Sequence, residues 1–258
     1  MAKDGRGLRQ VTRGPGDATT PDWSPDGRWL AYSLDECTIA LVRADGTHQR
    51  TVPSQTPEGC ETDPTFTPDG RHLVFERFDA TTGDDAIWVM DLTGGERRRI
   101  GTGPGGAATA EVSPDGRTVT FLSWLPDGLT ALFATSYRGG GPVRQVSPVL
   151  FGIAFKHGWS PDGKRIVTSD NADDLTQPAN LVTFRADGGG LQYLTHLTSA
   201  DARALAGGYS PDGKWVVYRL EHGGQYALMI VRPDGHGAHA VLPFSSFRPA
   251  FIDWGPAS

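Results

Sequence analysis

Short runs of alternating apolar and polar residues recur along the chain in a fixed order. One kind of run is rich in aliphatic and aromatic residues and follows a turn, as in Trp-Leu-Ala-Tyr at 29–32 and Leu-Val-Phe at 73–75. A second kind comes later, as in Ile-Ala-Leu-Val at 39–42 and Leu-Met-Ile-Val at 228–231. Alternation with a period of two, rich in β-branched and aromatic residues, is typical of β-strands. The pattern therefore predicts an all-β fold.

One turn motif precedes each run of the first kind. It reads Trp-Ser-Pro-Asp-Gly at 23–27 and recurs, with an aromatic or aliphatic first residue, at 66–70, 112–116, 159–163 and 209–213. Proline fixes the first corner of such a turn, and glycine supplies the positive φ that its end requires. The motif aspartates Asp26, Asp69, Asp115, Asp162 and Asp212 are 43 to 50 positions apart. A repeat of this length indicates stacked supersecondary units.

Each repeat contains the pattern of four short strands. The second run leads to another glycine turn, such as Asp45-Gly46 or Asp234-Gly235, and a last short run follows, such as Gln-Tyr-Leu at 192–194. Four strands in a unit of this size are typical of a β-propeller blade. Five complete blades are expected near residues 20–53, 63–101, 109–147, 156–195 and 206–242.

The two ends of the chain match parts of a further blade. Residues 4–13 resemble a turn followed by a fourth strand, and residues 248–256 resemble a first strand. The sequence therefore predicts one six-bladed β-propeller domain over residues 1–258, with five complete blades and one incomplete blade shared by the termini. We favour a natural chain that continues upstream of Met1 with the missing strands. The alternative is a five-bladed ring with two accessory end strands.

Composition and charge argue against two classes of partner, nucleic acids and membranes. Glycine (34) and proline (19) are frequent but lie at periodic turns, which favours ordered β-structure over disorder. The net charge is −6, with acidic and basic residues interspersed. Nucleic-acid-binding proteins normally carry a basic patch, so a nucleic-acid partner is not expected. No apolar run approaches the length of a membrane-spanning helix, so membrane insertion is not expected either. We expect a monomer.

The two cysteines occupy related places in the repeat. Cys37 lies between the second and third strands of one blade, and Cys60 lies in the connector that enters the next blade. These two connections open on the same face of a propeller, so a disulfide between neighbouring blades is one interpretation. Two free thiols are the other, and both remain open at this point. Two cysteines without a nearby Cys/His pattern do not predict a zinc site.

The repeat resembles a known family. The sequence Trp-Ser-Pro-Asp-Gly-(Arg/Lys) before an aliphatic run, together with Ile-Trp-Val-Met-Asp-Leu at 87–92 and Gly-Gly-Glu-Arg-Arg-Arg-Ile at 94–100, is similar to the TolB-type propeller repeat over residues 4–256. TolB is a periplasmic propeller that binds the peptidoglycan-associated lipoprotein and Tol membrane proteins. A similar repeat forms the gating propeller of prolyl-oligopeptidase-type peptidases. The resemblance implies an extracytoplasmic, non-enzymatic interaction scaffold; the alternative is an accessory propeller of a peptidase or another hydrolase.

The chain carries no pattern that predicts catalysis. Ser160 and Ser210 follow a Gly-x but lack the final glycine of a nucleophile elbow, and both are copies of the repeated turn. His236 and His239 fall in a glycine turn, which favours solvated side chains over a metal site. The acidic stretches 79–85 and 170–174 lack EF-hand spacing. We therefore expect no catalytic residue, no metal and no cofactor.

Acidic residues recur in the first strands, which line the channel of a propeller. Asp22, Glu111 and Asp253 stand at matching positions; Asp63 enters the first strand of the second blade, and His157 lies in that of the fourth. Together they predict an anionic channel mouth that attracts a cationic or polar ligand. The alternative is that these residues only line a wet channel, with His157 a packing residue. The expected partner is a protein or a small polar ligand, bound at this mouth and at the neighbouring loops 78–85, 124–128 and 170–178.

Overall fold

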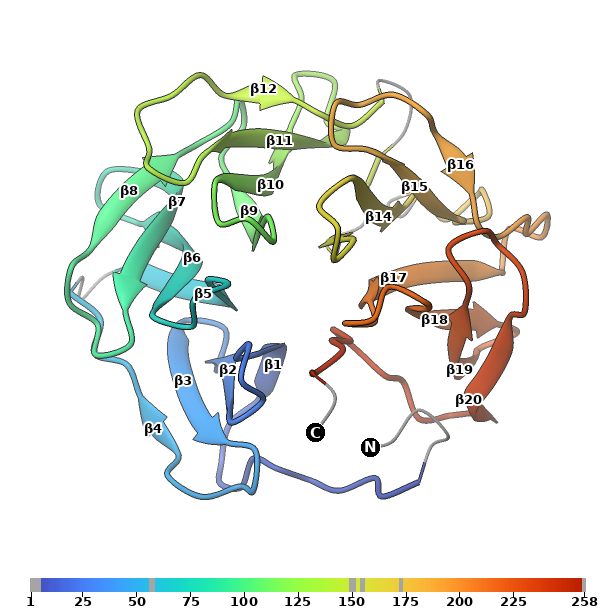
Figure 1. The fold of residues 1–258 in the computed structure, drawn as a ribbon, viewed down its shortest axis with the longest axis horizontal. Helices are drawn as coiled ribbons and strands as arrows, with labels where there is room; N and C mark the ends of the chain where they lie inside the picture. Colours follow the sequence, from blue (N-terminus) through green and yellow to red (C-terminus); the bar gives the residue numbers. More distant parts are fainter. Residues whose placement is uncertain (1–5, 56–58, 149–151, 154–155, 172–173, 257–258) are drawn as a thin grey trace. The chain divides into compact units, whose positions relative to one another are not determined.

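The structure, a computed structural model, describes residues 6–55, 59–148, 152–153, 156–171 and 174–256 (Figure 1). Every regular element in these ranges is a β-strand. The strands form five antiparallel four-stranded sheets, each made of strands that are consecutive in the chain. The fold is therefore an all-β β-propeller fold with five four-stranded blades. Its contacts divide the chain into two compact units.

The first unit, called the β1–β12 unit, comprises Val11–Val146 and Gly255–Ser258 and holds blades one to three. Blade one consists of β1 (Ala18–Trp23), β2 (Trp29–Leu34), β3 (Thr38–Arg43) and β4 (Arg50–Thr51). Blade two consists of β5 (Gly59–Phe66), β6 (His72–Asp79), β7 (Asp84–Asp91) and β8 (Arg98–Gly101). Blade three consists of β9 (Ala108–Val112), β10 (Thr118–Trp124), β11 (Thr130–Ser136) and β12 (Arg144–Gln145).

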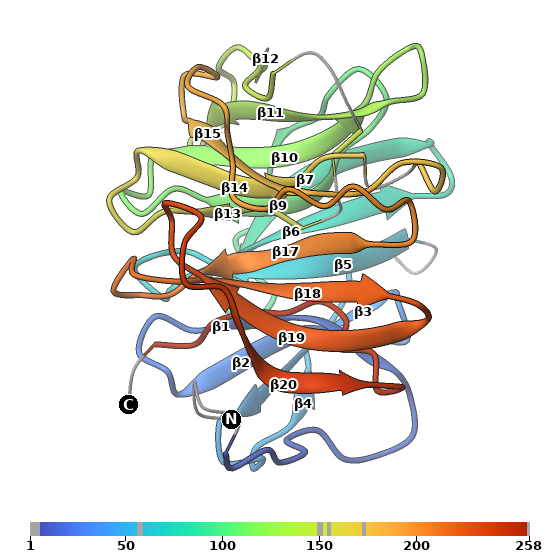
Figure 2. The same ribbon diagram turned by 90° about the vertical axis from the view of Figure 1, so that its right-hand side faces the viewer.

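The second unit, called the β13–β20 unit, comprises Met1–Gln10 and Ser147–Trp254 and holds blades four and five. Blade four consists of β13 (Gly158–Trp159), β14 (Arg165–Ser169), β15 (Leu181–Arg185) and β16 (Gln192–Tyr193). Blade five consists of β17 (Arg203–Tyr209), β18 (Val216–His222), β19 (Gln225–Val231) and β20 (His239–Ser245). Figure 2 shows the four strands of blade five in chain order.

All five copies of the repeated motif form the turn between the first and second strands of a blade. In the first copy, Ser24 Oγ donates to Asp26 Oδ1 at 2.7 Å and accepts the N–H of Trp29 at 2.9 Å. Gly27 has a φ of 67°, where a side chain would be strained. The same side-chain contacts recur at Thr67–Asp69, Ser113–Asp115, Ser160–Asp162 and Ser210–Asp212. The motif is thus a structural turn, as its repetition predicts.

Neighbouring blades within each unit share apolar layers. Val74 and Ile87 of blade two pack with Val119 and Phe121 of blade three. A second layer joins blades one and two, and a third joins blades four and five. Because apolar burial is the main driving force of folding, these layers hold adjacent sheets together.

The expected sixth, incomplete blade is not observed. Among the described residues, 6–17 and 246–256 form no strand, whereas the sequence predicts strands in both; residues 4 and 5 of the predicted partial blade lie outside the described residues. The physical reason is that a first and a fourth strand are not neighbours in a blade, so neither has an adjacent strand with which to form a hydrogen-bonded ladder. Instead, Val11 packs on the apolar cluster of blade one, and Ile252 and Trp254 pack on that of blade five.

Candidate functional site

Each blade has two chemically different ends. Because neighbouring strands are antiparallel, the turn between the second and third strands lies at the same end as the connector that leaves the fourth strand. We call this end the loop end and the opposite one, which carries the Ser-Pro-Asp-Gly turn, the turn end. Loops on one face of a repeat protein often form its binding surface.

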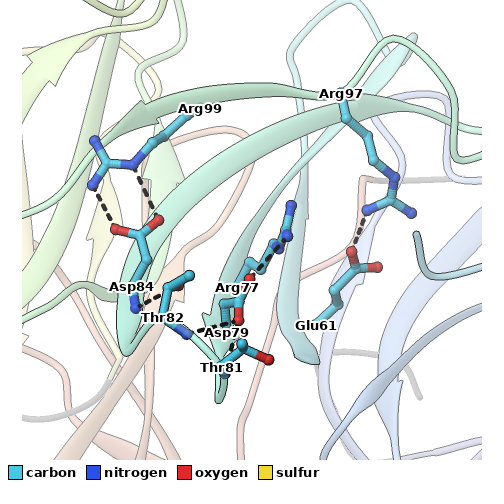
Figure 3. Close-up of polar contacts among 8 residues, drawn as sticks. All are labelled: Glu61, Arg77, Asp79, Thr81, Thr82, Asp84, Arg97 and Arg99. Atoms are coloured by element: carbon cyan, nitrogen blue, oxygen red, sulfur yellow. Dashed lines mark hydrogen bonds and ion pairs between the residues drawn. The ribbon is translucent and has the colours of Figure 1, made fainter. Parts of the chain in front are cut away.

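Blade two buries a charged pair between the start of β5, at its loop end, and the turn between β7 and β8. Glu61 lies eight residues before the motif aspartate, a position held by alanine in the other four blades. Its carboxylate forms an ion pair with Arg97, and both side chains are almost fully buried (Figure 3). Arg97 also donates to the carbonyls of Gly94 at 2.9 Å and Pro53 at 2.6 Å. These bonds fasten the connector between β4 and β5 to blade two.

Burial dominates the electrostatics of this pair. The pKa of Glu61 is raised because desolvation outweighs the favourable charge of Arg97. A buried ion pair recovers its desolvation cost only with good geometry and further hydrogen bonds. The two carbonyl partners of Arg97 supply such bonds. The pair therefore acts as an internal fastening rather than as a source of reactive charge.

The carboxylates of the acidic β6–β7 turn are paired within blade two (Figure 3). Asp79 accepts the N–H groups of Thr81 at 2.9 Å and Thr82 at 3.2 Å, which lowers its pKa, and lies 3.5 Å from Arg77. Asp84 pairs with Arg99 at 2.9 Å. These carboxylates are thus engaged by protein donors and do not converge on a cation. In the second acidic stretch, Asp170 accepts the N–H of Asn180 at 2.6 Å and Asp174 that of Thr176 at 2.9 Å, while Asp173 lies outside the described residues.

A disulfide joins blades one and two at the loop end. Cys37, in the turn between β2 and β3, is bonded to Cys60 at the start of β5, with Cα atoms 4.4 Å apart. Cys60 directly precedes Glu61. The disulfide and the Glu61–Arg97 pair therefore fasten the same segment by covalent and ionic means.

A second acid of blade two, Glu76, is half-buried on the face toward blade three. The pKa of Glu76 is raised to about 8, first by burial and then by the negative charges of Asp63 and Asp85. Its side chain accepts the backbone N–H of Thr109 from β9. Burial also raises the pKa of Asp85. At neutral pH the carboxyl of Glu76 is therefore largely protonated.

Glu76 takes part in a contact that recurs between blades. It stands seven residues after the motif aspartate, where Ser33 and Ser169 stand in blades one and four. Ser33 Oγ accepts the N–H of Asp63 at 2.9 Å, and Ser169 Oγ accepts that of Ala206 at 2.8 Å. In each case the donor lies in the first strand of the next blade. In blades one, two and four this position therefore ties the inner strand of the next blade to the preceding one, through serine in blades one and four and a carboxyl in blade two.

The three acids expected at a channel mouth in the β1–β12 unit have separate roles. Asp22 in β1 accepts the N–H of Phe66 at 2.7 Å and so joins β1 to β5. Asp63 has a φ of 50°, rare for aspartate, at an irregularity of the β5–β6 register. Its charge acts on Glu76. Glu111 in β9 is half-buried, and its backbone carbonyl accepts the Thr120 hydroxyl at 3.4 Å.

The two remaining predicted residues lie in the β13–β20 unit. His157 is fully buried directly before β13, and Asp253 is half-buried in the segment after β20. The structure thus brings Asp63 to Glu76 but does not place His157 or Asp253 relative to the other acids. The anionic mouth stays a prediction. Sequence reasoning missed Glu61, Glu76 and Arg97, although comparing equivalent repeat positions would have singled out both glutamates.

Ser160 and Ser210, the two near-matches to a nucleophile elbow, use their hydroxyls in hydrogen bonds within their own turns. Ser160 Oγ donates to Asp162 at 2.7 Å and accepts the N–H of Arg165 at 2.9 Å. Ser210 makes the equivalent bonds to Asp212 and Trp215. A nucleophilic serine instead needs a neighbouring general base. Both serines are turn residues, as the repeat predicts.

Five repeated four-stranded blades joined by apolar layers define a β-propeller repeat protein. The whole chain, residues 1–258, matches the family model described as the TolB beta propeller domain, and the chain belongs to this family. It is 27% identical over 213 residues to an uncharacterized protein of Agrobacterium fabrum, covering 81% of the chain and 66% of that protein. It is 26% identical over 191 residues to the uncharacterized peptidase YuxL of Bacillus subtilis, covering 61% of the chain and 29% of that protein.

Solved structures show the same fold. TolB from Acinetobacter baumannii superimposes with a TM-score of 0.75 at 23% identity, covering 94% of this chain and 58% of TolB. This chain thus spans less than two thirds of each of these proteins. In the part of the chain that the structure describes, no helix is long and apolar enough to cross a membrane.

Proposed function

We propose that this chain is a non-enzymatic protein-interaction module that binds its partner through the loop end of its blades. The distribution of exposed apolar side chains carries the proposal. Four exposed phenylalanines belong to the loop end, namely Phe78, Phe244, Phe247 and Phe251. Leu129 and Leu175 are exposed in the turns there, Leu175 to 76%. Exposed apolar patches mark interaction sites, and the concentration of these side chains at one end of the blades supports binding there.

The turn end is different in character. Of the large apolar residues that the structure describes as exposed, only Val143 and Leu191 lie in its turns; Leu8 lies in the N-terminal segment and Tyr193 in the outer strand β16. The turn end instead carries the hydrogen-bonded Ser-Pro-Asp-Gly turns. This asymmetry, present in each unit, favours the loop end as the binding surface.

The loops of blade two are also held in place before any partner binds. The Cys37–Cys60 disulfide, the Glu61–Arg97 pair and the Arg99–Asp84 pair fasten the strands and turns that present Phe78. A surface held in its bound conformation loses less entropy on association. Such a surface suits recognition of a folded protein or a peptide.

Family membership supports an extracytoplasmic setting. TolB-type propellers resemble this chain in their repeat, and TolB acts in the periplasm. A disulfide persists in oxidising compartments and is rare in a reducing cytosol. We therefore place the protein in the periplasm or outside the cell, as a monomer with a protein partner.

The alternative is an accessory propeller of a peptidase or another hydrolase. The similarity to YuxL, of which this chain spans 29%, favours it. In that case the propeller would bind a hydrolase domain or guide its substrate, and its own serines would remain turn residues. The two functions differ in what the loop end binds.

Quantitative affinity capture from the envelope fraction of the source cells tests the proposal. The bait is the intact protein, compared with Phe78→Asp and Leu129→Asp at the loop end. Arg71→Asp and Arg117→Asp, in exposed positions of the turn end of the same unit, are the matched controls. We expect the captured amount of one partner to fall about tenfold with the loop-end variants only, because these variants replace a buried apolar contact by a charge. Equal capture by all variants contradicts the proposal, and a hydrolase as the lost partner supports the alternative.

A further inference from the structure

The loop end of blade five combines a covered sheet face with a charged rim. Val217, Leu228 and Ile230 form an apolar cluster on this face, and Ile252 and Trp254 from the segment after β20 pack on it. Toward the loop end the same strands continue with charged residues. Arg219 in β18 stands opposite Leu228, and Glu221 stands opposite Tyr226. The covering segment therefore runs beside a polar cluster.

Arg219 is a buried cation with spare hydrogen-bonding capacity. Only 8% of the residue is exposed, and burial lowers its pKa. Nη1 donates to the carbonyl of Pro249 at 2.7 Å, and Nη2 lies 2.7 Å from the Glu221 carboxylate. Its Nε has no hydrogen-bond partner among the described residues. The equivalent residues of the other blades are uncharged or acidic, namely Ser33, Glu76, Leu122 and Ser169. Burying a guanidinium is costly, so a cation at this one position calls for a reason.

A second arginine shares the same carboxylate. Arg248 Nη2 lies 3.8 Å from Glu221 Oε1, and the Arg248 side chain is 60% exposed over the ring of Tyr226. Arg203, opposite Glu221 in β17, donates to the carbonyl of Asp174 at 3.4 Å. The Arg219 and Arg248 guanidinium groups therefore share the carboxylate of Glu221, while the charge of Arg203 acts on the carboxylate of Asp174. The group of Arg219, Arg248 and Glu221 thus carries one more positive charge than its carboxylate balances.

Exposed aromatic side chains adjoin these arginines in sequence. Phe247 directly precedes Arg248 and is 59% exposed, while Phe244 and Phe251 are also exposed. Phe251 has a φ of 49°, a strained conformation for a bulky residue that the packing of Ile252 maintains. Aromatic residues and arginine are the residue types most enriched in binding hot spots.

We propose that the loop end of blade five docks an acidic peptide segment of the protein partner. The guanidinium of Arg248, with Arg219 behind it, binds one carboxylate of that segment, and Phe247 and Phe244 contact an apolar side chain beside the carboxylate. A planar guanidinium matches a carboxylate with two parallel hydrogen bonds, and a basic peptide would meet uncompensated positive charge. The inference rests on the proposed interaction function and names the chemistry of the partner.

Selection of peptides on the intact protein tests this inference. A random-peptide phage library is panned on the immobilised wild-type protein, and recovered peptides are synthesised and measured by fluorescence polarisation. We expect peptides that pair Asp or Glu with an aromatic or aliphatic residue. We also expect their affinity to fall at least about tenfold with Arg248→Glu or Phe247→Ala, since a charge-assisted hydrogen bond or a buried aromatic is worth that much.

Matched controls lie at the turn ends of blades four and five. Arg232→Glu places the same charge change at the turn end of blade five, and Leu191→Ala removes an exposed apolar group from the turn end of blade four; both should leave affinity unchanged. Selected peptides that are not acidic, or that bind the loop-end variants and the wild type equally, overturn the inference but leave the interaction function standing. A library that yields no binding peptide also overturns the inference, while affinity capture of a protein partner decides the interaction function separately.

Discussion

At the scale of single residues, the inner positions of each repeat show where the blades differ. The residue seven places after the motif aspartate is serine in blades one and four, glutamate in blade two, leucine in blade three and arginine in blade five. Serine accepts one backbone N–H and is easily buried. A carboxyl or a guanidinium in the same place carries a desolvation cost. Glu76 and Arg219 are therefore the two ionisable residues at this position of the repeat.

Glu76 predicts a specific dependence of stability on pH. Its folded pKa of about 8 lies above its ordinary value of 4.5. The unfolded state therefore releases this proton first, and stability that is complete below pH 4.5 is lost as the pH rises toward 8. Glu76→Gln keeps the acceptor for Thr109 but cannot ionise. We expect this variant to be more stable than the wild type by about 3 kcal/mol at pH 7 and about equal to it at pH 4.

Urea unfolding of both proteins at several pH values measures this difference. The Gln variant should show a flatter stability curve between pH 4.5 and 8. If both curves run parallel, the carboxyl of Glu76 is not protonated in the folded protein, and the account of its burial is wrong.

The repeated turns predict loss of stability in acid. The pKa of Asp212 is lowered to about 2 by its hydrogen bonds with Ser210 and the N–H of Lys214, against an ordinary value of 3.8. Stability from this group is present above pH 3.8 and is lost as the pH falls toward 2. We expect Asp212→Asn to lower the melting temperature at pH 7 and to reduce its decline in acid. Thermal unfolding at pH 7 and pH 3 checks this, and an unchanged melting temperature at pH 7 speaks against it.

The sequence predicts the structure of the turn residues from local pattern, whereas the ligand-binding role predicted for the inner acids stays a prediction. The Ser-Pro-Asp-Gly turn is held by hydrogen bonds among its own residues, so its structure can be predicted from the motif alone. Asp22 and Asp63, in contrast, were predicted as ligand-binding acids from their strand positions. Asp22 bonds to a backbone N–H of the next inner strand, and Asp63 sits at an irregular register beside Glu76. Such roles depend on the neighbouring strand, which local pattern does not specify.

At the scale of elements, the connector between blades one and two depends on a buried ion pair. Blade one has alanine and glutamine, Ala18 and Gln49, where blade two has Glu61 and Arg97. Arg97→Gln alone leaves Glu61 buried without its partner, and we expect it to destabilise the protein by about 3–5 kcal/mol. Adding Glu61→Ala recreates the residues of blade one and should recover most of that loss.

Chemical denaturation of the wild type, both single variants and the double variant gives the coupling energy. Independent, additive losses would mean that the pair does not act as a unit. A double variant near wild-type stability would show that the pair fastens Pro53 and the connector without adding net stability of its own.

The disulfide belongs to the same segment. Cys37 and Cys60 are 23 residues apart, and loop-closure entropy gives a bridge of this span about 3 kcal/mol. We therefore expect Cys37→Ser with Cys60→Ser to lower the free energy of unfolding by that amount, and protein purified without reductant to resist iodoacetamide until it is reduced. Complete alkylation of the native, unreduced protein would contradict the disulfide.

Element prediction succeeded for the five full blades and failed at the termini for one reason. A strand is stable only when its backbone groups pair with a neighbouring strand. Inside each blade the neighbour comes from the adjacent run in the sequence. Residues 6–13 and 248–256 match strand patterns but lack that neighbour, so they pack through side chains such as Val11 and Ile252 instead.

Across the whole molecule, the two ends of the blades differ in what they expose. The turn ends are closed by hydrogen-bonded turns, whereas the loop ends carry the exposed phenylalanines, the disulfide and the arginines of blade five. Family membership identifies the TolB-type propeller, and the arrangement of each unit favours a binding surface on one end of its blades.

Hydrogen–deuterium exchange of the intact protein, with and without the partner recovered by affinity capture, tests this claim most directly. We expect the bound partner to slow exchange in the loop-end segments, including 79–84, 125–129 and 246–251, and to leave exchange in the turn-end segments 67–72, 113–118 and 210–215 unchanged. Protection confined to the turn ends, or spread equally over both ends, would contradict it.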